Sequence, residues 1–148
     1  MQFRYSRLYA DHNGASCFAD QTAELELGFA VPPAEPLYSA KFSAAGDVFW
    51  MGAIPAWRGD TPHPAPRRMA FVTVQGEYQI TATNGETRKF PIGTVLLIED
   101  TIGEGHMTKT SSTGNTIVFA VGLPPREETA AAPRREGGHI EIGHDGDG

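Results

Sequence analysis

The chain has 148 residues, of which 40% are hydrophobic and 20% charged, and this length and composition suit one globular domain with a single core. Its formal net charge of -6 and its isolated basic doublets, Arg67–Arg68 and Arg134–Arg135, exclude the clustered basic face that nucleic-acid binding requires. No stretch approaches the roughly 20 apolar residues of a membrane helix, the single cysteine, Cys17, cannot form an internal disulfide, and the polar opening MQFRYSRLYADHNG lacks a signal-peptide core, so a cytoplasmic protein is expected.

Short β-strand patterns follow one another along the chain. Apolar and acidic residues alternate in Thr22–Phe29, as in a half-buried strand. The other predicted strands are Ala40–Ser43, Val48–Ile54, Met69–Gln75, Glu77–Thr83, Glu86–Phe90, Thr94–Ile98, His106–Ser111 and Asn115–Val121. The Asn84–Gly85 pair predicts a tight hairpin, because both residues tolerate positive φ. Such closely spaced strands, with no helical period, predict an all-β sandwich or barrel.

The predicted domain spans residues 1–123, and residues 124–148 form a polar tail rich in alanine, glycine and charge. Within that tail, His139–Ile142 is compatible with an edge strand, and His139 and His144 with a loose metal-binding pattern. The edge strands and the tail favour a homodimer.

The segment TPHPAPRR, residues 61–68, carries proline at positions 62, 64 and 66. Alternate amides of an extended chain point to the same side, so one side of this segment lacks three N–H groups. That pattern predicts a sheet edge or the rim of a pocket. Residues two apart share a face of a strand, so the side chains expected to point the same way are His63, Ala65, Arg67 and Met69.

Two motifs resemble those of the cupin family. The first family motif is a His-x-His pair, a glutamate and a glycine, and counting back from Gly76 places Met69 at the glutamate. The same count places Ala65 at the second histidine and His63 at the first. In the second motif, FPIGTVLLI matches the glycine and apolar strand, and His106 matches the histidine that follows.

The resemblance covers residues 45–121 and is most specific over Gly85–His106. Trp57, Glu99 and Thr110 stand where the family has glycine, proline and asparagine. The chain looks like a subgroup of small bacterial cupins with HPAPRR and EDTxGxGH-type stretches. This resemblance implies a jelly-roll barrel that is often dimeric, and it does not imply a particular reaction.

A typical cupin holds a divalent metal with three histidines and one glutamate, and only His63 and His106 match those positions. The lost positions carry an alanine, which has no donor atom, and a methionine, whose soft thioether suits iron or manganese poorly. The resemblance therefore implies no metal, or a weakly held divalent metal at His63 and His106 whose shell Glu99, Asp100 or the substrate completes.

The favoured hypothesis is proton transfer on a small anionic organic molecule, in an enzyme of the isomerase, lyase or cyclase type. The unperturbed pKa of an imidazole is about 6.5, so a histidine can give or take a proton at physiological pH. His63 and His106 are therefore expected to be the acid and the base. Arg67 is expected to clamp a carboxylate or phosphate. The resemblance includes metal-free cupins, such as deoxysugar-nucleotide epimerases, that use a pocket histidine. The predicted pocket wall comprises Met69, Phe71, Thr73 and Thr108.

Two other functions stay open, a metal-dependent oxygenase with a reduced ligand set and a non-catalytic cupin that binds a small molecule. Structural roles also compete with functional ones. His63 suits a hydrogen-bonded edge position and His106 a loop position, while Arg67 suits pairing with a surface carboxylate. For Asp100, a turn that bonds its own backbone is the favoured interpretation.

Overall fold

The computed structural model describes residues 1–29 and 32–126, which form β-strands and no helix, so the prediction of an all-β chain is confirmed. Within these residues no helix could cross a membrane. The strands are β1 (Gln2–Ala10), β2 (Ser16–Glu24), β3 (Glu26–Phe29), β4 (Leu37–Ser39), β5 (Val48–Ala53), β6 (Arg58–His63), β7 (Met69–Gln75), β8 (Glu77–Ala82), β9 (Thr87–Pro91), β10 (Val95–Glu99), β11 (His106–Thr110) and β12 (Thr116–Gly122).

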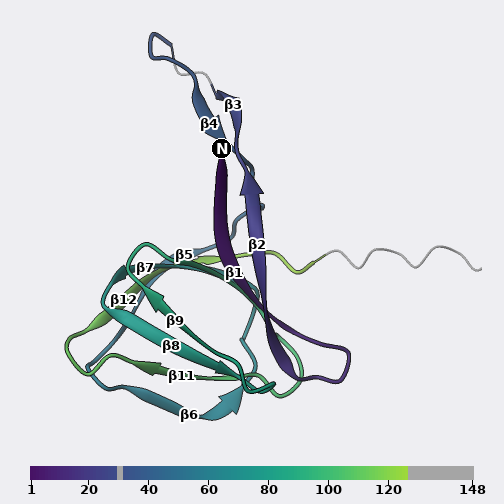
Figure 1. Cartoon of the computed structure of the whole chain (residues 1–148), viewed down its shortest axis with the longest axis vertical. Helices are drawn as coiled ribbons and strands as arrows, with labels where there is room; N and C mark the ends of the chain where they lie inside the picture. Colours follow the sequence, from purple (N-terminus) through teal and green to yellow (C-terminus); the bar gives the residue numbers. More distant parts are fainter. Residues whose placement is uncertain (30–31, 127–148) are drawn as a thin grey trace, which may run out of the picture.

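The strands form three sheets. Six strands follow the order β2-β1-β10-β7-β12-β5, four follow β6-β11-β8-β9, and β3 pairs with β4. The β1–β10 pair is parallel and the other ladders are antiparallel. Figure 1 shows the two larger sheets together in the body of the molecule, with the ends of β1 and β2 and the β3–β4 hairpin projecting from it. No strand ladder joins the two larger sheets in the part of the chain that the structure describes, so the predicted barrel is not closed.

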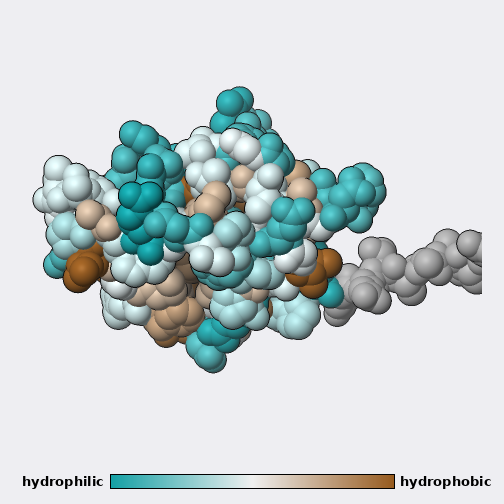
Figure 2. Space-filling model, turned by 90° about the horizontal axis from the view of Figure 1, so that it is seen from below, coloured by the Kyte–Doolittle hydropathy of each residue, from teal (hydrophilic) through white to brown (hydrophobic). Residues whose placement is uncertain are grey.

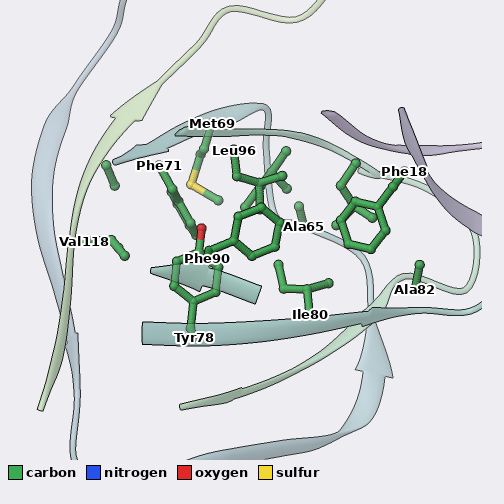
Figure 3. Close-up of a cluster of buried hydrophobic side chains, with 13 residues drawn as sticks. Phe18, Ala65, Met69, Phe71, Tyr78, Ile80, Ala82, Phe90, Leu96 and Val118 are labelled. Atoms are coloured by element: carbon green, nitrogen blue, oxygen red, sulfur yellow. The ribbon is translucent and has the colours of Figure 1, made fainter. Parts of the chain in front are cut away.

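The hydrophobic core lies between the two larger sheets (Figure 3). Burial alternates along β8, where Tyr78, Ile80 and Ala82 point inward, as the two-residue period of a strand requires. Tyr78 stacks on Phe90 with ring centroids 5.0 Å apart. The apolar run in β10 was predicted to be buried on both faces and is: Leu96 and Ile98 belong to the core, while Leu97 packs with Ala70 and Leu123 on the opposite face.

Most predicted strands from Val48 onward match β5 and β7–β12 to within a residue or two. The predictions nearer the N-terminus were less accurate. Thr22–Phe29 is divided between β2 and β3 at Leu25, where the chain passes from pairing with β1 to pairing with β4. Ala40–Ser43 is not a strand, and β4 lies just before it. β1 was not predicted, although it pairs over its whole length with β2, the next strand along the chain.

The Asn84–Gly85 hairpin between β8 and β9 is confirmed, with a different turn from the one expected. Only Gly85 has positive φ, at 95°. The amide of Gly85 donates to the Ala82 carbonyl, and the amide of Ala82 donates to the Glu86 carbonyl. These bonds describe a three-residue loop in which glycine supplies the left-handed position.

β6 is an edge strand of the four-stranded sheet, as the proline pattern predicts.

Figure 2 views the molecule from the side opposite the projecting strands and shows a mainly hydrophilic or neutral surface with small, separate hydrophobic areas. The predictions for residues 127–148, including the strand at His139–Ile142 and the metal pattern with His144, lie outside the described residues.

Candidate functional site

A cavity of about 430 Å³ opens between the two larger sheets, within the size range of small-molecule sites. Three of the predicted wall residues, Met69, Phe71 and Thr108, line it. Thr73 does not: it is fully buried, and its hydroxyl lies within hydrogen-bonding distance of the Phe90 carbonyl. The remaining wall is largely aromatic and aliphatic, so the cavity favours an apolar ligand body.

The four residues expected to share one face of the proline-rich segment, His63, Ala65, Arg67 and Met69, all line this cavity. The two predicted site histidines are also brought together there. His63 ends β6 and lies directly opposite His106, the first residue of β11, in the antiparallel register. Their ring centroids are 5.2 Å apart with the planes tilted by 42°. Two imidazoles far apart in the sequence can therefore contact one ligand.

The close approach of β6 and β11 depends on Gly105. This residue has φ of 79°, in the left-handed region that favours glycine. A Cβ atom at Gly105 would overlap the backbone of His63. Ser16 Oγ donates a 2.5 Å hydrogen bond to the Gly105 carbonyl and so ties this turn to β2. The backbone before His106 is thereby held against the end of β6.

His106 is paired with Asp100, a carboxylate with no exposed surface. His106 Nδ1 and Asp100 Oδ2 are 2.6 Å apart. Because an ionised carboxylate only accepts hydrogen bonds, Nδ1 carries the proton and Nε2 carries the lone pair. Among the described residues, His106 Nε2 has no hydrogen-bond partner, and unlike Asp100 Oδ1 it is not fully buried. His106 therefore presents a bare Nε2 to the cavity.

His63 has the same tautomer for a parallel reason. Its Nδ1 lies 3.3 Å from the carbonyl oxygen of Thr61, which can only accept a hydrogen bond, so Nδ1 donates and Nε2 is bare. Unlike His106, His63 is largely exposed and stands at the mouth of the cavity. One imidazole is thus enclosed and the other is in contact with solvent.

Arg67 also stands at the mouth of the cavity, where its Nη1 lies 3.2 Å from Asp47 Oδ2. Its guanidinium lies 5.4 Å from the centre of the Phe49 ring. A solvent-exposed ion pair of this kind contributes little to stability. The guanidinium can exchange Asp47 for an anionic group of a ligand at small cost.

Glu99 does not line the cavity and cannot complete a metal shell there. It is buried among three arginines, with Arg7, Arg68 and Arg126 at 2.9, 2.8 and 3.1 Å. Burial alone would raise the pKa of Glu99, but hydrogen bonds from Arg68 and Arg7 and the nearby charges outweigh it and lower that pKa. This network joins β1, β10 and the chain after β12 on the opposite side of the sheet.

Tyr78 contributes its ring to the cavity wall, while its hydroxyl is enclosed in the core. Among the described residues, Tyr78 Oη makes no hydrogen bond of good geometry. Burial raises the pKa of Tyr78 well above its usual value, and the nearby Thr73 counteracts this only in part. Tyr78 therefore remains a neutral wall residue and cannot serve as a phenolate base.

The side chains present do not fit the four-ligand metal centre of a typical cupin. Between residues 1 and 126, outside the masked positions, no group of three or more His, Cys, Asp or Glu side chains is arranged around a common point. Asp100 Oδ2 is paired with His106 and Asp100 Oδ1 is fully buried, so Asp100 does not supply a third ligand. Among the described residues, the candidate metal ligands at this cavity are therefore the two imidazoles.

Asp100 is the site residue that the sequence interpretation missed, because a turn role was favoured for it. It follows the last residue of β10, and its carbonyl accepts a 3.0 Å hydrogen bond from Ala65 N, which fixes it behind the proline-rich segment. The available signal was an acidic residue directly after a buried apolar strand, six positions before a histidine.

Comparison of the chain with protein-family models finds no match, and comparison with curated proteins finds no significant match either.

Proposed function

We propose that this chain is a cupin-type enzyme that binds a small anionic organic molecule in its cavity and transfers a proton by means of His106 and His63. The reaction is of the isomerase, lyase or cyclase type and uses the two imidazoles without a metal. The observation that carries this proposal is the Asp100–His106 pair, which leaves a bare Nε2 facing the same cavity as His63.

In this proposal His106 is the base. Its Nε2 removes a proton from a ligand carbon or hydroxyl, and the resulting imidazolium is stabilised by the Asp100 carboxylate at 2.6 Å. His63 is the second proton carrier, because it is close to His106 and is also exposed to water. It returns a proton to the ligand or exchanges one with solvent. His106 can thereby lose the proton it has taken up and act as a base in the next turnover.

The cavity wall also limits the ligand. Aromatic and aliphatic side chains such as Phe71, Ile98 and Val118 surround the interior, so the body of the ligand is apolar. Arg67 at the mouth offers a planar pair of donors for a carboxylate or phosphate. We therefore assign the ligand an apolar body, preferably an aromatic ring, with one anionic group that stays near the entrance.

The arrangement of the strands supports the cupin part of the proposal. Two facing β-sheets enclose the cavity, and the residues that match the first cupin motif, His63, Ala65 and Met69, line it together with His106 from the second. The jelly-roll topology remains part of this proposal. The antiparallel register places His63 directly opposite His106, so the residues that match the two motifs are neighbours.

A test that does not depend on knowing the reaction is hydrogen exchange into a bound carbon acid. The protein is incubated in D₂O with aryl oxo acids such as benzoylpropionate, which combine an aromatic ring, a carboxylate and a weakly acidic C–H group. We expect deuterium incorporation above the uncatalysed rate, measured by mass spectrometry. In His106→Gln the rate should fall by about 10²-fold or more, since a general base contributes that much.

The matched control is His12→Gln, which removes a histidine from the exposed turn after β1 and should leave exchange unchanged. Ligand binding is measured in parallel by calorimetry. Saturable binding without exchange in the wild type would identify a binding protein instead of an enzyme. Exchange that persists in both His106→Gln and His63→Gln would refute the assignment of the two imidazoles.

A further inference from the structure

The turn between β5 and β6 carries the chain from the six-stranded sheet to the four-stranded sheet (Figure 1). Trp57 ends this turn and lines the same cavity as His63 and His106, although the proton transfer proposed above gives it no role. The side chain is 42% exposed, whereas burying a tryptophan removes a large apolar area from water. A tryptophan that stays partly uncovered at a cavity is a candidate contact for a ligand.

The backbone holds Trp57 in this position at a local cost. Ala56 has a φ of 57°, in the left-handed region that residues other than glycine rarely adopt. The amide of Trp57 donates to the Ile54 carbonyl at 3.2 Å, which closes the turn, and to Thr110 Oγ1 at 3.0 Å. The amide of Thr110 in turn donates to the Trp57 carbonyl at 2.9 Å. Backbone strain of this kind persists only where the surrounding structure fixes it, and it is common at ligand-binding sites.

The indole ring reaches back along β6 as far as Gly59. A Cβ atom built at Gly59 would lie 3.0 Å from Trp57 Cη2 and 3.4 Å from Trp57 Cζ3, so the absence of a side chain there makes room for the ring. Other aromatic rings of the cavity wall already have partners, since Tyr78 stacks on Phe90 and meets Phe71 edge to face. Among the described residues, no aromatic ring is paired with that of Trp57. Its exposed surface is therefore available to a ligand.

The register of β6 and β11 places this ring close to His106. Gly59, beside the ring, pairs with Thr108. Thr108 lies two positions after His106 and lines the cavity with it, and two residues of a strand span about 7 Å. An irregularity in the β6–β11 pairing keeps His63 opposite His106 although His63 is four positions from Gly59. A ligand with one ring and a short chain can therefore contact Trp57 and reach His106.

We propose that Trp57 is the specificity-determining residue of this cavity and packs against an aromatic ring of the ligand, which brings a carbon atom close to that ring beside His106 Nε2. This role rests on the proposed function, because it uses the same cavity and the same base. It narrows the substrate class to aryl-substituted acids whose acidic C–H group is near the ring, for example next to an aryl ketone. Aromatic pairs contribute more than the area that they bury, so Trp57 favours such a ligand over an aliphatic acid.

The test compares benzoylpropionate with levulinate, which has the same oxo acid chain with a methyl group in place of the phenyl ring. Calorimetry, with levulinate measured by competition, should give a wild-type preference for benzoylpropionate of about 10²-fold. In Trp57→Ala this preference should fall by about tenfold, with levulinate affinity changed by less than about threefold. Trp57→Phe should retain most of the preference. A purely structural role would weaken both acids together and leave their ratio unchanged.

The matched control is the other tryptophan, Trp50, which is 67% exposed and does not line the cavity. Trp50→Ala should keep the full preference. Trp50→Phe leaves Trp57 as the sole tryptophan, and its fluorescence should change along the calorimetric saturation curve of benzoylpropionate.

The outcomes separate this role from the proposed function. Saturable binding with the expected preference but without hydrogen exchange would refute the enzyme and support Trp57 as the contact for the ring. A preference that survives in Trp57→Ala, or Trp57 fluorescence that stays constant at saturation, would overturn the role of Trp57 even if exchange is catalysed. Failure of benzoylpropionate to bind at about 10 mM would overturn both.

Discussion

Asp100 Oδ2 accepts a 2.6 Å hydrogen bond from His106 Nδ1 at a point where the aspartate has no exposed surface. The pair fixes which imidazole nitrogen faces the cavity. It also gives His106 a partner that can stabilise its protonated form, which a solvent-exposed histidine would lack.

Asp100→Asn should separate this electronic role from a structural one. The amide has the same shape but no charge, and its NH₂ group can bond to Nδ1 and move the imidazole proton to Nε2. We expect the exchange rate to fall by about 10²-fold or more, with ligand binding changed by less than about threefold. Asp60→Asn is the control, because Asp60 is exposed on β6 and pairs with Arg58 outside the cavity. Unchanged exchange in Asp100→Asn would assign the aspartate a packing role only.

The Gly105 turn predicts a second contrast. Gly105→Ala would place a Cβ atom on the His63 backbone at a left-handed φ, so it should destabilise the protein by more than about 3 kcal/mol or displace β6. Gly85 also has positive φ, but nothing lies within 4 Å of a Cβ built there. Gly85→Ala should therefore cost only about 1 kcal/mol. Urea unfolding of the two variants measures the difference, and equal costs would contradict the close approach at Gly105.

The Glu99 network predicts an acid-sensitive part of the stability. The unfolded chain binds the Glu99 proton near pH 4.3, at about the ordinary glutamate pKa, whereas the native protein binds it only at lower pH. The stabilisation is thus complete above that range and is lost as the pH falls through the native pKa.

Glu99→Gln should cost about 2–4 kcal/mol at pH 7, because it leaves three guanidinium groups around a neutral side chain. Between about pH 5 and pH 3, the range around the ordinary glutamate pKa, the free energy of unfolding should also fall less steeply in the variant than in the wild type. Glu104→Gln, at an exposed loop position, should behave as the wild type. A wild-type-like pH profile in Glu99→Gln would show that other carboxylates account for the acid sensitivity.

The cupin register predicts a gain of metal binding. Ala65 lines the cavity on the same side as His63, at the position of the family's second histidine. Ala65→His should therefore add a third imidazole to the pair and raise the affinity for Zn²⁺ or Co²⁺ by about 10²-fold or more. The visible spectrum of bound Co²⁺ and calorimetry measure the effect. Pro64→His, at the preceding position, which does not line the cavity, is the control, and equal gains in both variants would contradict the register.

The sequence supports the fold class and much of the cavity, for reasons tied to local patterns. The alternation in β7 and β8 and the hairpin at Asn84–Gly85 depend on neighbouring residues, and they were predicted well. β1 was missed because arginines stand on both faces of its sequence, QFRYSRLYA, and obscure the apolar alternation, although it pairs with the adjacent β2 as well as with the distant β10. The proline pattern at residues 61–68 predicted both the edge strand and the common face of His63 and Arg67.

The role of Asp100 could not be predicted from local rules. A single aspartate after a strand is usually a turn residue, and only the folded chain places its carboxylate beside His106. The same limit applies to Glu99, whose three arginine partners come from distant parts of the sequence. Partnerships between side chains across sheets require the tertiary arrangement.

A long-range ¹H–¹⁵N NMR spectrum of the histidine rings, recorded during titration with the carboxylic acid that binds most tightly, tests the proposed site of His63 and His106. The Nδ1–H tautomer is predicted for both His63 and His106, with both Nε2 resonances shifting along the same saturation curve as one ligand contacts both. The account is contradicted if His106 carries its proton on Nε2, or if only one ring responds to the ligand.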